Sequence, residues 1–307
     1  MKIKTLVITP GDPKGIGPEV TQKALSHLWK ELKDTRVVIF SKKFLVTNKL
    51  PIEFIEPPAY AAKELQVGWA IESATQFVSS SPTSMALITG PINKVNLQNS
   101  GYHFNGHTDF LASLTKSKKV TMVLANNWFR VALITDHCAL KDVPKNITAK
   151  KIISTIEQVA EFSRNHLGKK NPKIAILGLN PHAGEEGILG KEEINIIVPA
   201  MKKALDHAKK NKLKLELTGP HSADSFFAVE KERVKDNKGH DFIIAQYHDQ
   251  GLIPIKLSDF SNGLNITLGL PFVRTSVAHG TAFDIAGKNK ADPGSMIYAI
   301  RKAIEYL

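Results

Sequence analysis

Short apolar runs alternate with longer amphipathic stretches along most of the chain. Residues 4–9, 36–40 and 85–89 are rich in Val, Ile and Leu and are bounded by polar residues, Gly or Pro, a pattern that predicts short buried strands. The longer stretches at 18–30 and 62–79 are predicted to be helices. Strands that alternate with helices in this way indicate an α/β fold with a largely parallel sheet.

The same alternation continues in the second half of the chain. Residues 119–125 and 128–135 are predicted to form a strand pair with a short turn between them. Thr148 is predicted to cap a helix whose apolar residues recur with helical spacing. A further short buried strand is predicted at 241–246, so the second half also has the α/β pattern.

Histidines follow three of the predicted strands. His137, His182 and His248 each come within a few residues of the end of an apolar run. In open α/β sheets, ligands bind beyond the carboxyl ends of the strands. Imidazole nitrogens suit Zn²⁺ and similar divalent ions. The residues alone leave two interpretations open: one shared metal site, or three separate hydrogen-bonded histidines.

Polar groups are concentrated just after the strand predicted at 241–246. His248 and Asp249 arrive together there, where side chains often do chemistry. Gly251 and Pro254 are predicted to stop regular structure directly afterwards. A polar turn that only caps the strand is the alternative.

Two further loops have the composition of binding loops. Residues 10–17 contain three glycines between a predicted strand and a predicted helix, with a spacing that matches neither a Rossmann fingerprint nor a Walker A motif. Residues 106–109, Gly-His-Thr-Asp, open a predicted helix and can present a hydroxyl, an imidazole and free N–H groups to an anion. The alternative for Thr108 is an ordinary N-cap.

Composition narrows the class of protein. The chain has 307 residues, 42% hydrophobic and 23% charged, which is typical of a soluble globular protein. No apolar run approaches the length of a membrane span, and the first residues lead into a strand rather than a signal peptide. Cys138 is the single cysteine, which excludes an intrachain disulfide and fits a cytoplasmic location.

The formal net charge of +12 raises the question of nucleic acid. The lysines are scattered over helix-like stretches, where a solvated face is the usual explanation, and no nucleic-acid-binding motif is present. A positive field also recruits small anionic substrates. We therefore expect a small anion as the partner, and neither nucleic acid nor a membrane; a non-enzymatic nucleic-acid binder is the disfavoured alternative.

Six short motifs cover the chain from its first predicted strand to its C-terminal region. They are 8–19, 89–94, 106–109, 179–184, 247–251 and 265–276. Together, in this order, they closely resemble the 4-hydroxythreonine-4-phosphate dehydrogenase family of pyridoxal phosphate biosynthesis. The resemblance implies two α/β/α units with mostly parallel sheets flanking a cleft, as in isocitrate and isopropylmalate dehydrogenases. It implies a discontinuous cofactor-side domain, 1–98 plus 270–307, and a metal- and dimer-side domain, 99–269.

The resemblance also implies a metal centre and a dimer. A divalent ion (zinc, magnesium or cobalt) would be held by His137, His182 and His248, with ligands shared across a homodimer interface. Asp224 matches a family carboxylate near the metal and is the weaker candidate ligand. Asp249 is a candidate for the catalytic base.

The implied substrate site contains cationic, hydroxyl and amide side chains. They are His107, Thr108, Lys256, Asn265 and Arg274. Cations and a hydroxyl suit a phosphate, and Arg with Asn can orient a carboxylate. Lys256 is in addition a second candidate for the base.

Residues 279–288 resemble the adenosine-side loop of isocitrate and isopropylmalate dehydrogenases. The resemblance implies that this loop binds NAD, or NADP, without a Rossmann fingerprint. The implied cofactor-binding residues are His279, Gly280, Thr281, Asp284 and Gly287.

The implied activity is the oxidation of 4-phosphooxy-L-threonine at C3, followed by decarboxylation to 3-amino-2-oxopropyl phosphate. A paralogous dehydrogenase of threonate or erythronate 4-phosphate is the nearest alternative. Phosphate acyltransferases have a related fold, but the three histidines and the loop at 279–288 disfavour acyl transfer.

Overall fold

The computed structural model describes residues 3–46, 49–59, 66–99, 101–104 and 106–307. The chain divides into two compact units, Met1–Val120 with Ser261–Leu307 (unit 1) and Thr121–Phe260 (unit 2). The first unit is discontinuous, with limits that differ from residues 98 and 269. The assignment of a cofactor side and a metal side stays a prediction.

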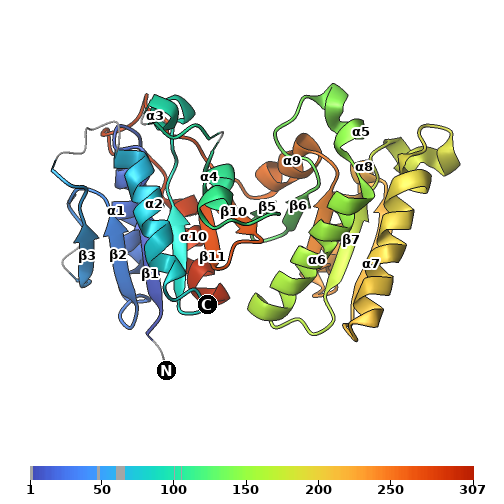
Figure 1. The fold of residues 1–307 in the computed structure, drawn as a ribbon, viewed down its shortest axis with the longest axis horizontal. Helices are drawn as coiled ribbons and strands as arrows, with labels where there is room; N and C mark the ends of the chain where they lie inside the picture. The colour runs from blue at the N-terminus through green and yellow to red at the C-terminus, as the bar shows by residue number, and fades with distance from the viewer. Residues whose placement is uncertain (1–2, 47–48, 60–65, 100, 105) are drawn as a thin grey trace. The chain divides into compact units, whose positions relative to one another are not determined.

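Unit 1 is built on a mostly parallel sheet (Figure 1). Among the described residues its strand order is β3 (Ile52–Ile55), β2 (Arg36–Phe40), β1 (Thr5–Thr9), β4 (Met85–Thr89), β11 (Val273–Val277) and β10 (Leu264–Leu268). Every neighbouring pair is parallel except β10 and β11. β1 and β4 are in register to their last residues, where Thr9 pairs with Thr89.

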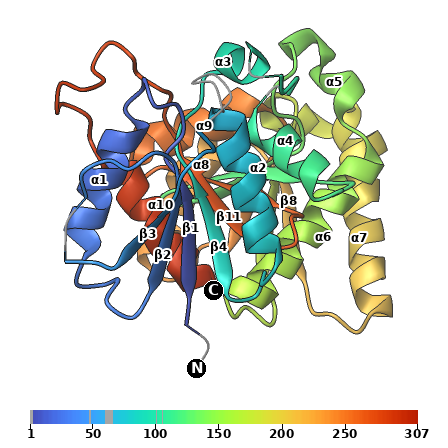
Figure 2. The ribbon, with the colours of Figure 1, turned by 60° about the vertical axis from the view of Figure 1, so that its left-hand side comes forward.

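Helices cover both faces of this sheet (Figure 2). They are α1 (Gly17–Leu28), α2 (Gln66–Ser79), α3 (Lys94–Asn99), α4 (His107–Leu114) and α10 (Gly294–Tyr306). One core cluster packs α2 and α4 on β1, β2 and β4 through residues such as Val7, Ile71 and Phe110. Helices α1 and α10 pack against each other. Because both faces are covered, β1 and β4 are almost wholly buried and read as continuous apolar runs.

Among the described residues of unit 2, the strand order is β5 (Thr121–Ala125), β6 (Arg130–Leu133), β9 (Phe242–Ala245), β7 (Lys173–Leu177) and β8 (Glu216–His221). β5 and β6 are the predicted antiparallel pair, and the other neighbours are parallel. Asn126 forms the turn between them, because its Oδ1 accepts hydrogen bonds from the backbone N–H groups of Trp128 and Phe129 at 2.9 Å. The α/β fold class is confirmed in both units.

The helices of unit 2 also cover two faces. They are η2 (Leu140–Asp142), α5 (Val143–Asn146), α6 (Ala149–His166), η3 (Pro181–Gly187), η4 (Glu193–Ile197), α7 (Val198–Lys210), α8 (Ala223–Lys235) and α9 (His248–Ser258). α6 and α7 pack together, while α8 and α9 contribute Phe226, Leu252 and Ile255 to one core cluster with the sheet. Thr148 caps α6 as predicted, since its Oγ1 accepts from Lys151 N at 3.3 Å.

The prediction that Gly251 and Pro254 stop regular structure is wrong. Helix α9 begins at His248 and continues through both residues to Ser258. A Cβ on Gly251 would lie 2.9 Å from the side chains of Val131 and Leu133, so the glycine lets the helix approach β6 closely. The burial that this approach provides outweighs the poor helix propensity of Gly and Pro.

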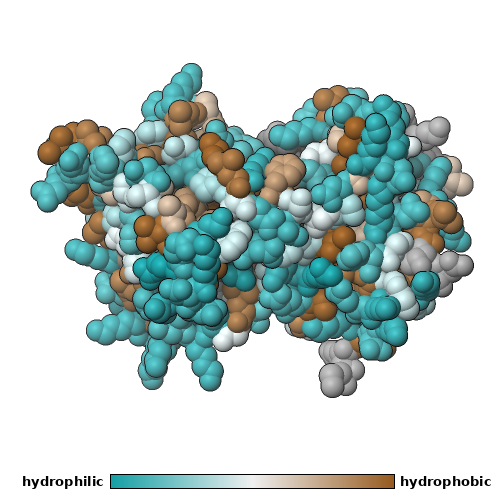
Figure 3. Space-filling model, turned by 180° about the vertical axis from the view of Figure 1, so that it is seen from behind, coloured by the Kyte–Doolittle hydropathy of each residue, from teal (hydrophilic) through white to brown (hydrophobic). Residues whose placement is uncertain are grey.

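The surface is mostly hydrophilic, as expected from a chain with 23% charged residues. The face drawn in Figure 3 is mostly hydrophilic, with hydrophobic side chains in small groups. Within the described ranges, no helix is both long and apolar enough to cross a membrane.

Candidate active site

Side-chain amides join the carboxyl ends of β6, β9 and β7 in unit 2. Gln246, fully buried, donates from Nε2 to Leu177 O at 2.7 Å, and its backbone carbonyl accepts from Thr135 Oγ1 at 2.7 Å. Gln250 donates from Nε2 to Gly178 O at 2.8 Å. These bonds fix the edge from which all three predicted histidines extend.

His137 and His248 lie side by side at this edge. Their ring centroids are 5.6 Å apart. His248 Nδ1 is 2.7 Å from Asp249 Oδ1, so Nδ1 carries the proton and donates it in a hydrogen bond to the carboxylate, which leaves the lone pair on Nε2. A carboxylate that orients an imidazole is the usual second partner of a metal-binding histidine. Asp249 therefore has an orienting contact that competes with its predicted role as a base.

His182 lies on a loop with an unusual backbone. The five residues from His182 to Glu186 all have positive φ, between 43° and 84°. For L residues, this conformation costs about 1–2 kcal/mol each, so the surrounding contacts must hold it. The exposed His182 is thus presented by a strained loop.

Glu193, which sequence reasoning missed, anchors that loop. Its buried carboxylate accepts hydrogen bonds from Leu179 N at 2.7 Å, from Asn180 N at 2.8 Å and from Asn180 Nδ2 at 2.9 Å. Burial raises the pKa of Glu193. The hydrogen bonds from Asn180 and Leu179 lower this pKa by more than burial raises it, so the pKa lies below its ordinary value. A charged Glu193 therefore holds the base of the loop.

Asp224 is the electrostatic neighbour of His182. It lies in the first turn of α8, and this helix packs against the His182 segment η3. A hydrogen bond from Ser222 Oγ at 2.6 Å is the main cause that lowers the pKa of Asp224, and the charge of His182 contributes. The four predicted ligands are thus arranged as two pairs, His137 with His248 and His182 with Asp224.

Within the residues that the structure describes, these pairs are not gathered into one metal site. No group of three or more His, Cys, Asp or Glu side chains in the described part of the chain could hold a metal ion. Two imidazoles and an imidazole–carboxylate pair are nevertheless donors that divalent transition metals prefer. The donor chemistry fits the implied ion.

In unit 1, the loops after β1 and β4 interlock. Asp12 N donates to Pro91 O at 2.9 Å. A Cβ on Gly11 would lie 2.1 Å from Pro91 O, and a Cβ on Gly90 would lie 2.0 Å from Pro10 O, so any other residue at either position would separate the two loops. The glycine-rich loop predicted from the sequence is therefore packed against a second loop at the strand ends.

Arg274 is the most unusual side chain of unit 1. It is 2% exposed, and its guanidinium donates to Thr267 Oγ1 at 2.9 Å and to Thr89 Oγ1 at 2.6 Å. Its Nε is buried with no hydrogen-bond partner. Burial lowers the pKa of Arg274 to about 9, so the group remains charged at neutral pH. A buried cation with only hydroxyl partners is short of an anion.

Two other polar atoms in unit 1 share this deficit. His107 Nε2 and Asn265 Oδ1 are buried without a hydrogen-bond partner. Burial first, and the charge of Arg274 second, lower the pKa of His107 well below 6.5, so this imidazole is neutral. The interaction shows that His107 and Arg274 are electrostatic neighbours. Together the three predicted substrate residues supply unused donors and one unused acceptor.

The predicted alternative for Thr108 is wrong, because Gly106 is the N-cap of α4 and makes no side-chain cap. Thr108 is the second residue of α4, next to His107, and Asp109 follows in the first turn. An uncapped helix start leaves backbone N–H groups for a ligand. Lys256, the remaining predicted substrate residue, is exposed on α9 of unit 2.

The predicted cofactor loop borders a groove in unit 1. Ile16 N donates to Thr281 O at 2.9 Å, which joins the loop to the glycine-rich segment 10–17. The groove has a volume of about 560 Å³, and its lining includes Lys14, Gln22 and Gly287. The two loops that the sequence singled out thus line one groove.

Comparison with known proteins identifies the family. Residues 21–303 match the family model described as pyridoxal phosphate biosynthetic protein PdxA. The chain belongs to the PdxA family. It is 42% identical to a 4-hydroxythreonine-4-phosphate dehydrogenase of Sulfurihydrogenibium sp. (strain YO3AOP1), over 97% of each chain. The resemblance predicted from the motifs is confirmed, as is the enzyme class of dehydrogenase.

Solved structures support the PdxA assignment. A crystal structure of 4-hydroxythreonine-4-phosphate dehydrogenase from Klebsiella pneumoniae is 34% identical, with a TM-score of 0.81 over 99% of each chain. An isocitrate dehydrogenase from Methylococcus capsulatus, 14% identical with a TM-score of 0.52 over 99% of this chain and 85% of that one, shares the fold alone. The predicted isocitrate dehydrogenase-like fold is therefore confirmed for this PdxA chain.

Proposed function

We propose that the chain oxidises 4-phosphooxy-L-threonine at C3 with NAD⁺ and a divalent metal, and that the β-keto acid formed loses CO₂ to give 3-amino-2-oxopropyl phosphate. The names of its close relatives support this substrate. The observation that carries the proposal is a set of buried side-chain atoms without hydrogen-bond partners. Arg274 Nε and His107 Nε2 can donate to an anionic group, and Asn265 Oδ1 can accept from a hydroxyl or ammonium group of the ligand.

The role of Arg274 follows from its geometry. A guanidinium fixed by two threonine hydroxyls has its plane set before a ligand arrives, and it can bind a carboxylate or phosphate through two parallel hydrogen bonds. The neutral His107 can donate from Nε2 without adding a second buried charge. Asn265 and Thr108 add a side-chain acceptor and a hydroxyl.

A divalent ion would be held by His137, His182 and His248, with Asp224 as the weaker ligand. When bound, such an ion lowers the pKa of a hydroxyl that it coordinates. Asp249 would orient His248 through the contact at 2.7 Å. We propose that a homodimer completes the ligand set, because the described side chains of one chain are arranged only as pairs. Zinc, magnesium and cobalt all suit this donor set.

The nicotinamide cofactor would lie against the loop at 279–288. Such a cofactor, when bound, would supply the hydride acceptor for C3. The groove between this loop and residues 13–22 supports that location, and His279, Gly280, Thr281, Asp284 and Gly287 are the proposed contacts. NADP is the alternative cofactor.

A base must remove the C3 hydroxyl proton. Asp249 and Lys256 are the candidates, and Asp249 already accepts a hydrogen bond from His248 Nδ1. A carboxylate that is engaged in that hydrogen bond is less free to remove the C3 hydroxyl proton, so we favour Lys256 of the two. The single exposed cysteine, Cys138, supports a cytoplasmic location.

A dehydrogenase of another phosphorylated hydroxy acid, such as threonate or erythronate 4-phosphate, is the second candidate. One observation favours keeping it. A terephthalate 1,2-cis-dihydrodiol dehydrogenase of Burkholderia xenovorans is 25% identical, with a TM-score of 0.66 over 99% of this chain and 98% of that chain. Chains of this fold are thus named for different substrates.

The test is NADH absorbance with NAD⁺, 4-phosphooxy-L-threonine and a divalent metal, with and without chelator. We expect NADH formation that the chelator abolishes and added metal restores. No NADH from folded, metal-loaded protein would contradict the proposed substrate. NADH formation that is unaffected by thorough metal removal would contradict the metal requirement.

A further inference from the structure

The loop that would bind the cofactor has little structure of its own. Between Thr281 and Asn289 the backbone hydrogen bonds outside helices and strands are Ile285 N to Ala282 O and Lys288 N to Ile285 O, both at 3.2 Å. Ala282, Gly287 and Asn289 have positive φ of 41°, 73° and 58°. A segment of this kind keeps its shape only if its two ends are held.

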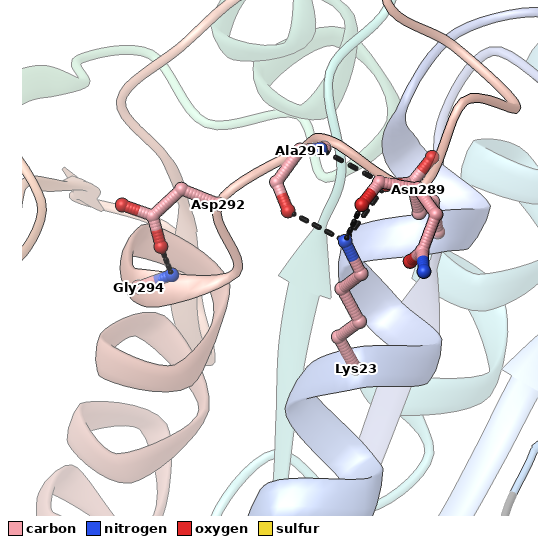
Figure 4. A network of polar contacts seen from close by, with 6 residues as sticks. Lys23, Asn289, Ala291, Asp292 and Gly294 are labelled. Carbon is pink, nitrogen blue, oxygen red and sulfur yellow. Dashed lines mark hydrogen bonds and ion pairs between the residues drawn. The ribbon is translucent and has the colours of Figure 1, made fainter.

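Helix α1 holds the far end of the loop through one lysine. Lys23 Nζ donates to Asn289 O at 3.1 Å and to Ala291 O at 2.9 Å (Figure 4). The near end is held by the bond from Ile16 N to Thr281 O. Both anchors therefore come from α1 and the residue that precedes it.

Glu19 completes this anchor one helical turn earlier. Its Oε1 accepts from Lys23 Nζ at 2.9 Å and from Ala291 N at 3.0 Å, so Ala291 is held through both its N–H and its carbonyl. Next in the chain, Asp292 Oδ1 accepts from Gly294 N at 2.9 Å where α10 begins (Figure 4). The segment after the loop is thereby fixed to two helices.

The environment of this pair makes it more than a surface ion pair. The side chains of Lys23 and Glu19 are 27% and 13% exposed, whereas those of Arg301 and Glu31 in unit 1 are 45% and 48% exposed. Burial raises the pKa of Glu19, but the hydrogen bonds from Lys23 and Ala291 lower it more, so Glu19 is charged at neutral pH. Pairs shielded from water are less weakened by salt than exposed ones.

We propose that Glu19 and Lys23 are positioning residues that preform the loop 281–288 for the nicotinamide cofactor. Glu19 itself lines the groove that this loop borders. The inference rests on the proposed function, because it assigns the groove to the cofactor. A loop that is ordered before binding saves the entropy of ordering it, so the pair acts on cofactor affinity and leaves hydride transfer unchanged.

The test compares Lys23→Met and Glu19→Gln with Glu31→Gln, which removes one charge of the exposed pair. For Lys23→Met we expect the KM for NAD⁺ to rise about tenfold, as for loss of one or two charge-assisted hydrogen bonds that preorganise the loop. The kcat and the KM for the phosphorylated substrate should change less than about twofold. Lys23→Arg should restore most of the affinity, and Glu31→Gln should have no effect.

Hydrogen exchange of the unliganded protein gives a readout that does not depend on turnover. Amides of 281–291 should exchange faster in Lys23→Met than in wild type, while those of β1 and β4 stay protected. Unchanged exchange in 281–291, or an unchanged KM for NAD⁺, would overturn the inference. If wild type forms no NADH at all, the proposed function fails, while the exchange experiment still decides whether the pair orders the loop.

Discussion

The predicted substrate residues of unit 1 and the predicted metal ligands of unit 2 differ in how complete they are. In unit 1, Arg274 is buried and rigidly held by two hydroxyls. In unit 2, His137 and His182 are exposed, and the ligands occur as separate pairs. A desolvated cation lacks only its anion, whereas exposed imidazoles lack further ligands. The first group is therefore preformed, whereas the described ligands of the second are not gathered into one group of three or more.

The largest effect is expected from Arg274→Ala. Loss of a buried, bidentate anion contact should raise the KM for the phosphorylated substrate by about 10²–10³-fold, equivalent to roughly 3–4 kcal/mol. The fold should persist, because removing a buried charge relieves a desolvation cost. Steady-state kinetics with circular dichroism check this. A KM equal to that of wild type would show that Arg274 does not bind the substrate.

His248→Ala tests the predicted metal ligands of unit 2. We expect loss of bound metal and about a hundredfold or greater loss of metal-dependent turnover, because one of few ligands is missing. His27→Ala, a change of an exposed histidine on α1, is the matched control and should retain both. Metal content by mass spectrometry is the direct measurement. Wild-type turnover by the metal-stripped His248→Ala variant would remove His248 from the metal site.

Glu193→Gln tests the carboxylate that holds the loop of His182 in unit 2. The neutral amide weakens the bonds to Leu179 and Asn180, so we expect the free energy of unfolding to fall by about 1–3 kcal/mol. Since the pKa of Glu193 is lowered on folding, its stabilising contribution is present above the unfolded pKa and is lost as pH falls through the folded value. Urea unfolding at pH 7 and pH 4 should show a smaller difference between variant and wild type at pH 4. An equal difference at both pH values would contradict a charged anchor.

The smallest effect concerns His107. Its pKa is lowered on folding, so the unfolded state binds the proton first, and stability should decline as pH falls below 6.5. His107→Gln removes this titration and keeps a polar side chain. Denaturant midpoints between pH 7.5 and 5.5 should therefore fall less in the variant than in wild type. If the denaturant midpoints of variant and wild type fell equally over this pH range, His107 would not be buried in its neutral form.

Much of this architecture could be predicted, because the apolar and polar patterns of the sequence agree with the burial of the strands in the folded chain. Buried parallel strands such as β2 and β4 are continuous apolar runs, and their predicted limits, 36–40 and 85–89, agree with the structure. Helix α9 could not be predicted, because its stability depends on how closely Gly251 approaches β6. That approach is a property of the packed sheet and leaves no mark in local sequence.

The residues of the candidate site also fall into those that the sequence predicts and those that it does not. Histidines that follow strands are visible in a sequence, and so are motifs that resemble a family. Glu193 and Gln246 are not, because a buried Glu or Gln that holds a loop through backbone groups reads like any polar helix or strand-end residue. The partners of Arg274 are likewise two threonines from separate strands, Thr89 and Thr267, joined only by the fold.

This PdxA chain is expected to oxidise a phosphorylated amino acid. The most direct measurement is kcat/KM for 4-phosphooxy-L-threonine beside unphosphorylated 4-hydroxy-L-threonine and the threonate and erythronate 4-phosphates, each with NAD⁺ and metal. We expect the phosphorylated amino acid to be preferred over its unphosphorylated form by about a hundredfold or more, since buried polar groups reject a ligand that leaves them unpaired. Equal values for these two, or a higher value for an acid without the amino group, would contradict the claim.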